Sequence, residues 1–272
     1  MANNKFSVIY PDIGAGGGSG GCVMQTEDAV PETHGGLEAG TDINGMQPCD
    51  VLKMILFPYQ YPAFTSFYID GQATQLEVGQ VISGGVRTLK WTTSRPENIQ
   101  ENSISIKDVN ANQVLGQNLA NDGQEDLDIG SDKTSNGINS YYTWRISGVN
   151  TKGQTFSRDF RVYWRARVYW GTSVNDTLTE NEVKNLENSA LKSGYAEHYS
   201  FDNPNGEGLY YYIVYPTEWG EVNQAVDCDN GFGWDISYAG DIDVTNSYGA
   251  TITYKLLRTT YKQTGSACVE LS

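Results

Sequence analysis

The chain has 272 residues, the length of one large domain or two ordinary ones, and its 18 Lys and Arg against 33 Asp and Glu give a formal charge of −15. This charge argues against a nucleic-acid binder, because affinity for the phosphate backbone rests largely on Lys and Arg. It also disfavours docking on anionic lipid. The 30 glycines, 18 tyrosines and low content of Lys and Glu favour strands joined by tight turns over a helix-rich fold.

No stretch of about 18 consecutive apolar residues occurs, so we expect no membrane span. The N-terminus lacks the basic and then apolar run of a signal peptide, and we expect a product made in the cytoplasm.

The first 45 residues are predicted to form an extended, Gly-rich arm. Residues 14–21 are nearly all glycine, and too few apolar side chains follow to bury a core. Two interpretations stay open at this point: a disordered tail, or an arm that orders on a neighbouring subunit. In the second case the one short apolar segment would supply interface residues, namely Phe6, Ile9 and Tyr10.

Residues 46–62 are predicted to form a short helix and a linker. Pro48 suits the first turn of a helix, and Pro58 ends it because the residue before a proline avoids the helical region. The predicted helix of about ten residues is too short to be stable alone and must pack on something. We favour packing on the next domain, the alternative being a partner protein. The expected interface residues of this segment are Leu52, Ile55, Leu56 and Tyr59.

Residues 63–166 are predicted to be an immunoglobulin-like β-sandwich. Apolar residues alternate with polar ones in about seven short segments, and turn signals such as Asp70-Gly71 separate them. Trp91 and Trp144 are expected in its core.

Residues 167–272 are predicted to be a second β-rich domain, opening with a strand near Val168. Thr179 followed by Glu182 forms a capping box, so a helix is expected over about 180–192. Asn246–Gly249 reads as a hairpin turn. Further strands are expected at 209–216, 242–245, 251–257 and 267–271. The fold class is therefore mainly β, with one short helix in the second domain and the arm in front.

The four cysteines, at 22, 49, 228 and 268, form no CxxC pair, so a structural zinc site is not expected. We favour free, partly buried thiols for all four. The alternative is a bridge between Cys228 and Cys268 if the protein ends up outside a cell.

Catalytic chemistry is not expected, because the only histidines are His34 and His198, in different segments, and no nucleophile or phosphate-binding motif is present. We predict no enzyme activity, no cofactor and no metal. Two acidic clusters, one around residues 122–132 and one at Asp227 and Asp229, are read as solvated loop charge rather than calcium ligands. Aromatic residues at 210–215, Trp219 and Trp234 are read as core, with carbohydrate binding as the alternative.

Several segments in order resemble a family of structural proteins in the virions of tailed bacteriophages. The resemblance spans about residues 41–262 and departs from the family in the Gly-rich start. The segments that carry it are Asp50–Tyr59, Pro62–Phe67, Leu76–Gly79, Leu89–Ser94, Tyr142–Gly153, Val168–Ser173, Leu178–Glu180, Tyr211–Pro216 and Val244–Gly249.

The resemblance implies a non-enzymatic virion component of a tail, baseplate, fibre or head decoration, with immunoglobulin-like domains. Its expected partners are other virion proteins and copies of itself, with no nucleic acid. The alternative function is a module of a phage fibre or adhesin whose C-terminal domain binds host-surface glycan. A glycan-cleaving or peptidoglycan-cleaving enzyme is the third and least favoured class.

Overall fold

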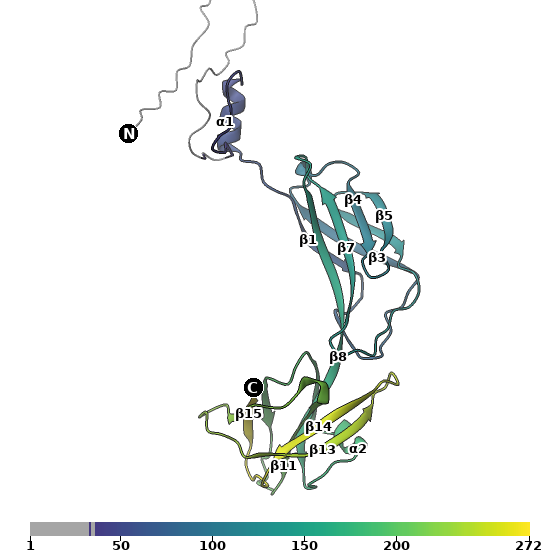
Figure 1. Cartoon of the computed structure of the whole chain (residues 1–272), viewed down its shortest axis with the longest axis vertical. Helices are drawn as coiled ribbons and strands as arrows, with labels where there is room; N and C mark the ends of the chain where they lie inside the picture. The colour runs from purple at the N-terminus through teal and green to yellow at the C-terminus, as the bar shows by residue number, and fades with distance from the viewer. Residues whose placement is uncertain (1–32, 34–35) are drawn as a thin grey trace, which may run out of the picture. The chain divides into compact units, whose positions relative to one another are not determined.

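The structure, a computed structural model, describes Thr33 and residues 36–272 (Figure 1). The arm residues Phe6, Ile9 and Tyr10 lie outside the described residues. Contacts divide the chain into two units, Met1–Pro62 and Ala63–Ser272. Within the described part, no helix is long and apolar enough to cross a membrane.

The first unit contains the expected helix, α1 (Pro48–Leu56), with Pro48 in its first turn. Pro58 follows directly after the helix cap Phe57, as the sequence predicts. The helix buries one residue, Val51, against Leu37 and Ile43.

The second unit is mainly β. Its strands are β1 (Ala63–Ile69), β2 (Gln75–Glu77), β3 (Val86–Ser94), β4 (Ile104–Asp108), β5 (Gln113–Leu119), β6 (Gly123–Asp128), β7 (Tyr141–Val149), β8 (Thr155–Ser173), β9 (Asn188–Lys192), β10 (His198–Phe201), β11 (Tyr210–Pro216), β12 (Ala225–Asp227), β13 (Ile236–Thr245), β14 (Thr251–Thr259) and β15 (Ala267–Leu271). Its helical pieces are α2 (Glu180–Lys184) and the 3-10 turns Pro96–Asn98 and Thr217–Trp219.

The first sandwich, defined here as β1–β7 with the first half of β8, is immunoglobulin-like. One antiparallel sheet has the order β1-β3-β6, and the other runs β8-β7-β4-β5, with the short β2 added parallel to β8. Trp91 and Trp144 are buried between the sheets, as predicted. The chain changes sheet repeatedly, as in a Greek-key sandwich.

The acidic side chains around residues 122–132 are exposed, as expected, but the segment is not all loop, because residues 123–128 form the edge strand β6 paired to β3. Its carboxylates bind neighbouring donors instead of solvent alone. Asp126 accepts from the Thr88 hydroxyl at 2.6 Å, and Asp132 accepts from the Gly84 amide at 2.8 Å. The strand was missed because its polar sequence lacks the alternation of a half-buried strand.

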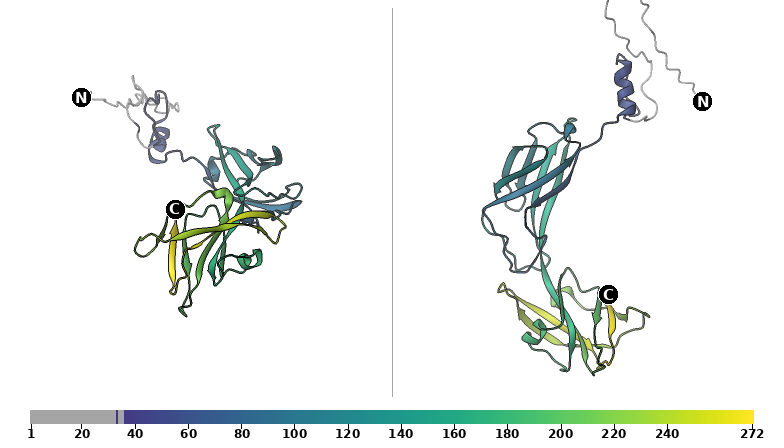
Figure 2. Two further views of the ribbon diagram at one scale, coloured as in Figure 1. Left: turned by 60° about the horizontal axis from the view of Figure 1, so that its bottom comes forward. Right: turned by 180° about the vertical axis from the view of Figure 1, so that it is seen from behind.

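The second sandwich, defined here as the second half of β8 with β9–β15 and α2, shares β8 with the first. We expected a new strand to open near Val168, but β8 runs unbroken through 19 residues, seen from behind in Figure 2. Its first half pairs with β7 and its second half with β11 and β9. The expected bounds at 166 and 167 thus fall inside one strand.

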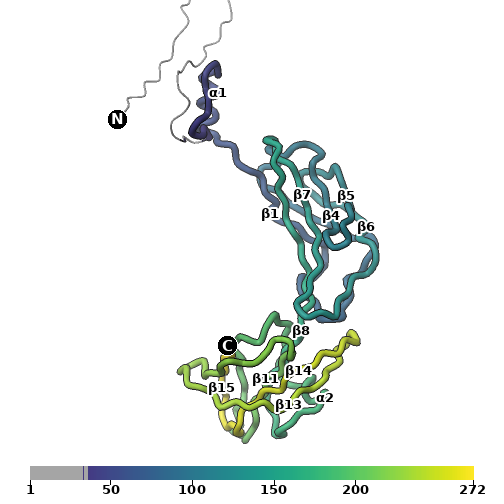
Figure 3. The backbone as a smooth tube through the Cα atoms, in the orientation of Figure 1, coloured from purple at the N-terminus to yellow at the C-terminus, as the bar shows by residue number. Residues whose placement is uncertain are grey.

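The sheets of the second sandwich have the orders β13-β14-β11-β8, with β9 on the free side of β8, and β10-β15-β12. The β13–β14 hairpin, yellow-green in Figure 3, turns through Asn246–Gly249 as predicted. In that turn Gly249 has a φ of +80°, which favours glycine. Asn246 also donates to the Val78 carbonyl at 2.6 Å, joining the hairpin to the first sandwich.

The helix predicted over 180–192 is shorter than expected. Thr179 and Glu182 form the capping box, but α2 ends at Lys184 and residues 188–192 form strand β9. The apolar residues Ala190 and Leu191, taken as a continuing helix face, instead pair with β8. Hydrogen bonding of residues 188–192 to the free side of β8 stabilises the strand more than their weak helical pattern would stabilise a helix.

Cys228 and Cys268 form a disulfide with a Cα–Cα distance of 5.3 Å. The favoured expectation of free thiols was therefore wrong for this pair. Cys49 is free and exposed, and Cys22 lies outside the described residues.

Candidate functional site

The predicted interface residues on α1 are exposed within their unit. Leu52 is 54%, Ile55 37% and Leu56 59% exposed, and Phe57 joins them at 76%. Tyr59 is half-buried and its ring meets that of Tyr61 edge-on at 5.1 Å. The structure thus groups three of the seven predicted residues into one apolar helix face.

A second candidate site, which sequence analysis did not find, lies on the outer face of β4, β7 and β8. Residues directly opposite each other on paired strands share a face of the sheet. The register places Lys107 opposite Arg145, and Arg145 opposite Asp159. We call the group the cationic face, formed by Lys107, Tyr141, Arg145, Asp159, Arg161, Tyr163 and Arg165.

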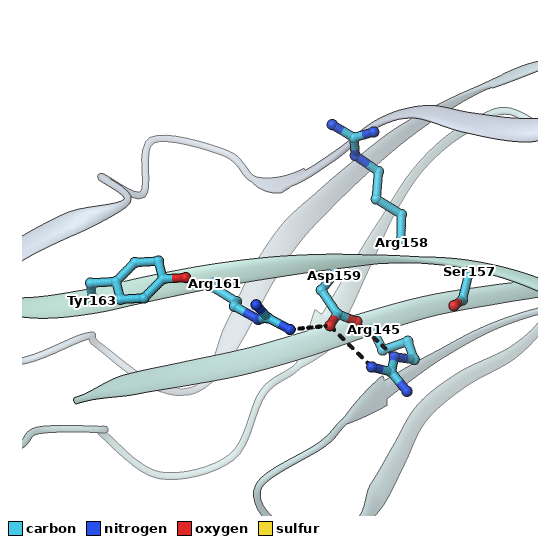
Figure 4. Close-up of a pocket in the computed structure, with 6 residues that line it drawn as sticks. All are labelled: Arg145, Ser157, Arg158, Asp159, Arg161 and Tyr163. Atoms are coloured by element: carbon cyan, nitrogen blue, oxygen red, sulfur yellow. Dashed lines mark hydrogen bonds and ion pairs between the residues drawn. The ribbon is translucent and has the colours of Figure 1, made fainter. Parts of the chain in front are cut away.

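Asp159 lies between two arginines at the centre of the cationic face (Figure 4). Arg145 donates to both of its oxygens, at 2.6 and 3.0 Å, and Arg161 donates at 2.9 Å. The hydrogen bond from Arg145, followed by the charges of Arg145 and Arg161, holds the pKa of Asp159 below its usual range against the opposing effect of burial. The carboxylate therefore stays ionised and fixes both guanidinium groups.

Tyrosine rings flank the arginines. Tyr141 and Tyr163 face each other across the strands with ring centroids 5.6 Å apart. Arg165 stacks over Tyr163 at 4.5 Å and Arg161 over Tyr141 at 5.4 Å. Such stacking leaves part of each guanidinium edge available to a ligand.

The arginines border an open groove of about 400 Å³ lined by polar side chains. Ser157, Arg158 and Tyr163 also line it. The Arg158 side chain points away from Asp159 in Figure 4 and donates to the Phe64 carbonyl at 3.0 Å. With four cations and one carboxylate, the cationic face carries +3, so the rest of the chain is more acidic than the total of −15. Its chemistry suits carboxylate or other anionic groups, which arginine binds in bidentate fashion.

Asp227, Asp229 and His198, which the sequence analysis singled out, are not part of the cationic face. Asp227 accepts from the amides of Asp229 and Asn230 in a turn, at 2.9 and 3.2 Å. His34 lies outside the described residues, and His198 is exposed on β10 beside Glu270, with 3.3 Å between Nε2 and Oε2.

The aromatic strand at 210–215 is core, as favoured from sequence. Tyr211, Tyr212 and Tyr215 are at most 2% exposed and offer no stacking surface to a sugar. Trp219 and Trp234 are half-buried against the same core.

Two sequence signals could have indicated the cationic face. Residues 158–167 contain four of the chain's arginines in ten positions, and alternation along a strand places Arg161 and Arg165 on one side. The strand pairing that adds Arg145 and Lys107 is a long-range feature and is not visible in sequence.

No protein-family model matches the chain, and no curated protein matches it. Among solved structures, the chain is similar to Streptomyces avermitilis α-L-rhamnosidase complexed with L-rhamnose, at 12% sequence identity and a TM-score of 0.23. The alignment covers 78% of this chain and 23% of that one. A TM-score this low does not indicate a shared fold.

Proposed function

We propose that the chain is a non-enzymatic structural component of a tailed-bacteriophage virion, present in many copies and joined to its neighbours through its N-terminal arm and the surfaces of its β domains. The ordered resemblance across residues 41–262 supports the virion assignment. The mainly β architecture, with two sandwiches built on one strand, suits a rigid particle subunit.

The observation that carries the assembly role is the cationic face on a strongly acidic chain. A second copy of the chain offers a matching partner, because the edge strand β6 displays Glu125, Asp126 and Asp128, all exposed. Contact between two different surfaces of identical subunits repeats from copy to copy. Opposite charges on those surfaces would orient the subunits and accelerate their encounter.

The virion assignment is tested on purified particles of the phage that encodes the chain. Antibody-labelled electron micrographs should show the protein at one repeated place on the particle, and peptide mass spectrometry should detect it in intact virions. Its absence from purified particles in both measurements would contradict the proposal.

The contribution of the arm is tested by deleting residues 1–45. The truncated protein should fold with unchanged β-sheet circular dichroism and fail to enter particles when it replaces the full chain. Normal incorporation of the truncated protein would show that the arm is dispensable for assembly.

The cationic face is tested by the double substitution Lys107→Gln with Arg161→Gln, which keeps the Arg145–Asp159 ion pair intact. Exposed ion pairs are worth about 0.2–1 kcal/mol each, so losing two cations should weaken self-association by about two- to thirtyfold at low salt. Analytical ultracentrifugation at low and high salt measures this change.

The matched control for that experiment is Lys152→Gln with Lys262→Gln, which removes two exposed cations outside both the cationic face and α1. The control should associate like the natural protein. Equal association of both double variants, or no dependence on salt, would exclude the cationic face as an assembly contact.

A further inference from the structure

The outward side of the sheet β10-β15-β12 brings together four potential metal ligands from three strands. His198 is on β10, Cys268 and Glu270 are on β15, and Cys228 directly follows β12. The register pairs His198 with Glu270, and the Cys228 amide donates to the Cys268 carbonyl at 3.1 Å. The neighbouring residues Tyr199, Val269 and Leu271 point inward and are buried.

The donor atoms are already close. One ring nitrogen of His198 and the sulfurs of Cys228 and Cys268 lie within 4.8 Å of one another. In a tetrahedral zinc site with Zn–S near 2.3 Å and Zn–N near 2.0 Å, such atoms lie about 3.5–3.8 Å apart. Side-chain rotations therefore suffice to reach ligand geometry once the two sulfurs are no longer bonded to each other.

A fourth ligand and access for the ion are also present. The Glu270 carboxylate lies 3.3 Å from His198 Nε2, and the two side chains line an open hollow of about 500 Å³. His198 and Glu270 have side-chain exposures of 62% and 45%, so an ion can enter from solvent. Among the described residues, this is the one place where three or more His, Cys, Asp or Glu side chains bring their donor atoms together.

We propose that this cluster is a redox-dependent metal site: the reduced chain binds a tetrahedral divalent cation of the zinc type through Cys228, Cys268 and His198, with Glu270 or water as the fourth ligand, and the oxidised chain replaces the ion with the disulfide. Two thiolates and an imidazole form a donor set that favours zinc over magnesium or calcium, which prefer oxygen ligands.

A dithiol can convert the oxidised state to the reduced state by thiol–disulfide exchange. The dithiol transfers two electrons and two protons to the Cys228–Cys268 bond, which yields two protein thiols and one cyclic disulfide of the reductant. Binding of the divalent ion then displaces the two thiol protons to solvent, because thiolate is the ligand form. In either state the sites on β15 and after β12 stay linked, by an S–S bond or through the ion.

The test uses the full-length chain and Co²⁺ as a spectroscopic substitute for Zn²⁺. After reduction by a dithiol and removal of the reductant without air, Co²⁺ should produce thiolate charge-transfer bands and the intense visible bands of tetrahedral coordination. The signal should saturate at one ion per chain, and Zn²⁺ should displace it. The oxidised chain should show neither band.

Substitutions separate this site from binding by the other thiols. Cys22→Ser with Cys49→Ser should leave the titration unchanged, whereas Cys228→Ser with Cys268→Ser should abolish the thiolate bands. His198→Ala should weaken binding by at least about tenfold, because it removes a direct ligand. Glu270→Gln should weaken it less and decide between the carboxylate and water as the fourth ligand.

A second measurement covers the case in which reduction loosens the sandwich. One equivalent of Zn²⁺ should raise the thermal unfolding temperature of the reduced chain, since an ion that binds the folded state stabilises it, and should slow alkylation of exactly two thiols. A reduced chain that gains neither stability nor thiol protection from Zn²⁺ would overturn the proposal. Binding that persists unchanged in His198→Ala would overturn it equally.

Discussion

The two sandwiches on either side of β8 fill their interiors with different chemistry. The first buries tryptophan, phenylalanine and aliphatic side chains, among them Trp91, Trp144 and Phe160, whereas the second buries five tyrosines that are each at most 2% exposed. The buried tyrosines of the second are Tyr199, Tyr211, Tyr212, Tyr215 and Tyr254.

The tyrosine hydroxyls hold backbone outside the strands, as two indole N–H groups do in the first sandwich, where Trp91 donates to the Ala120 carbonyl at 3.1 Å and Trp164 to the Gln80 carbonyl at 2.7 Å. Tyr199 donates to the Tyr195 carbonyl at 2.7 Å, Tyr212 to the Asn175 carbonyl at 3.0 Å, and Tyr211 to the Gly265 carbonyl. A buried hydroxyl needs such a partner. In the second sandwich, buried side chains thus hold the loops between strands by hydrogen bonds. The disulfide adds a covalent link, and the described part of the first sandwich has none.

The largest expected effect appears at high pH and originates in the tyrosines of the second sandwich. Burial raises the pKa of Tyr169, Tyr212 and Tyr215 to about 12, compared with about 10 when unfolded. These tyrosines therefore lose their protons at a higher pH in the native state than in the unfolded state. Their contribution to the free energy of unfolding is complete below pH 10 and is lost between pH 10 and 12, a total loss of several kcal/mol.

Tyrosinate absorbance and tryptophan fluorescence followed from pH 8 to 12.5 measure this loss. Unfolding should accompany tyrosine ionisation within that window. A chain that stays folded above pH 12 would show that the second core does not depend on neutral tyrosines.

The core of the first sandwich should be most sensitive at Trp144, which is fully buried. Trp144→Ala should lower the free energy of unfolding by about 3–5 kcal/mol, and Trp144→Phe by less, because it leaves a smaller cavity. Urea unfolding followed by circular dichroism measures both. Because β8 belongs to both sandwiches, one transition is expected; two separate transitions would mean that the sandwiches unfold independently.

Loss of the disulfide should weaken the second sandwich by about 2–4 kcal/mol, since the bridge closes a loop across a sequence separation of 40. Cys228→Ser with Cys268→Ser, measured with a metal chelator present, isolates the covalent contribution. Cys49→Ser is the matched control and should be neutral. An unchanged unfolding midpoint in the double variant would contradict the expected stabilisation.

The smallest effect is expected on the surface of the first sandwich. Asp159→Asn should cost roughly 1 kcal/mol or less near pH 7, because its arginine partners are partly exposed. A carboxylate with a lowered pKa stabilises the fold above its unfolded pKa, near 4, and this contribution is lost as the pH falls through the folded value.

Thermal unfolding at pH 7 and pH 2.5 tests this dependence, with Asp229→Asn as an exposed control. The difference between natural protein and Asp159→Asn should shrink at the lower pH. A difference that persists there would assign the effect to packing rather than charge.

Local signals in the sequence were sufficient for much of the fold. Pro48 and Pro58 bound α1, alternation marked β1 and β7, and Asn246–Gly249 marked the β13–β14 hairpin. These features depend on residues within a few positions of one another, where propensity and turn chemistry act.

Long-range pairing decided what the sequence left open. Residues 123–128 form the strand β6 because they pair with β3. Residues 188–192 form a strand because they pair with the side of β8 that β11 leaves open. The cationic face and the Cys228–Cys268 pair join positions up to 58 and 40 residues apart, from Lys107 to Arg165 and from Cys228 to Cys268. A single sequence does not encode such registers in any local pattern.

The unbroken strand β8 has a mechanical consequence. No flexible linker separates the two sandwiches, so tension along β8 is borne directly by hydrogen-bonded neighbours: β7 and β2 on the first half, β11 and β9 on the second. Such a load would act along the strands and would have to shear many hydrogen bonds together rather than open them one at a time. The chain at β8 is thus suited to transmit force between its two β halves without first extending a spacer.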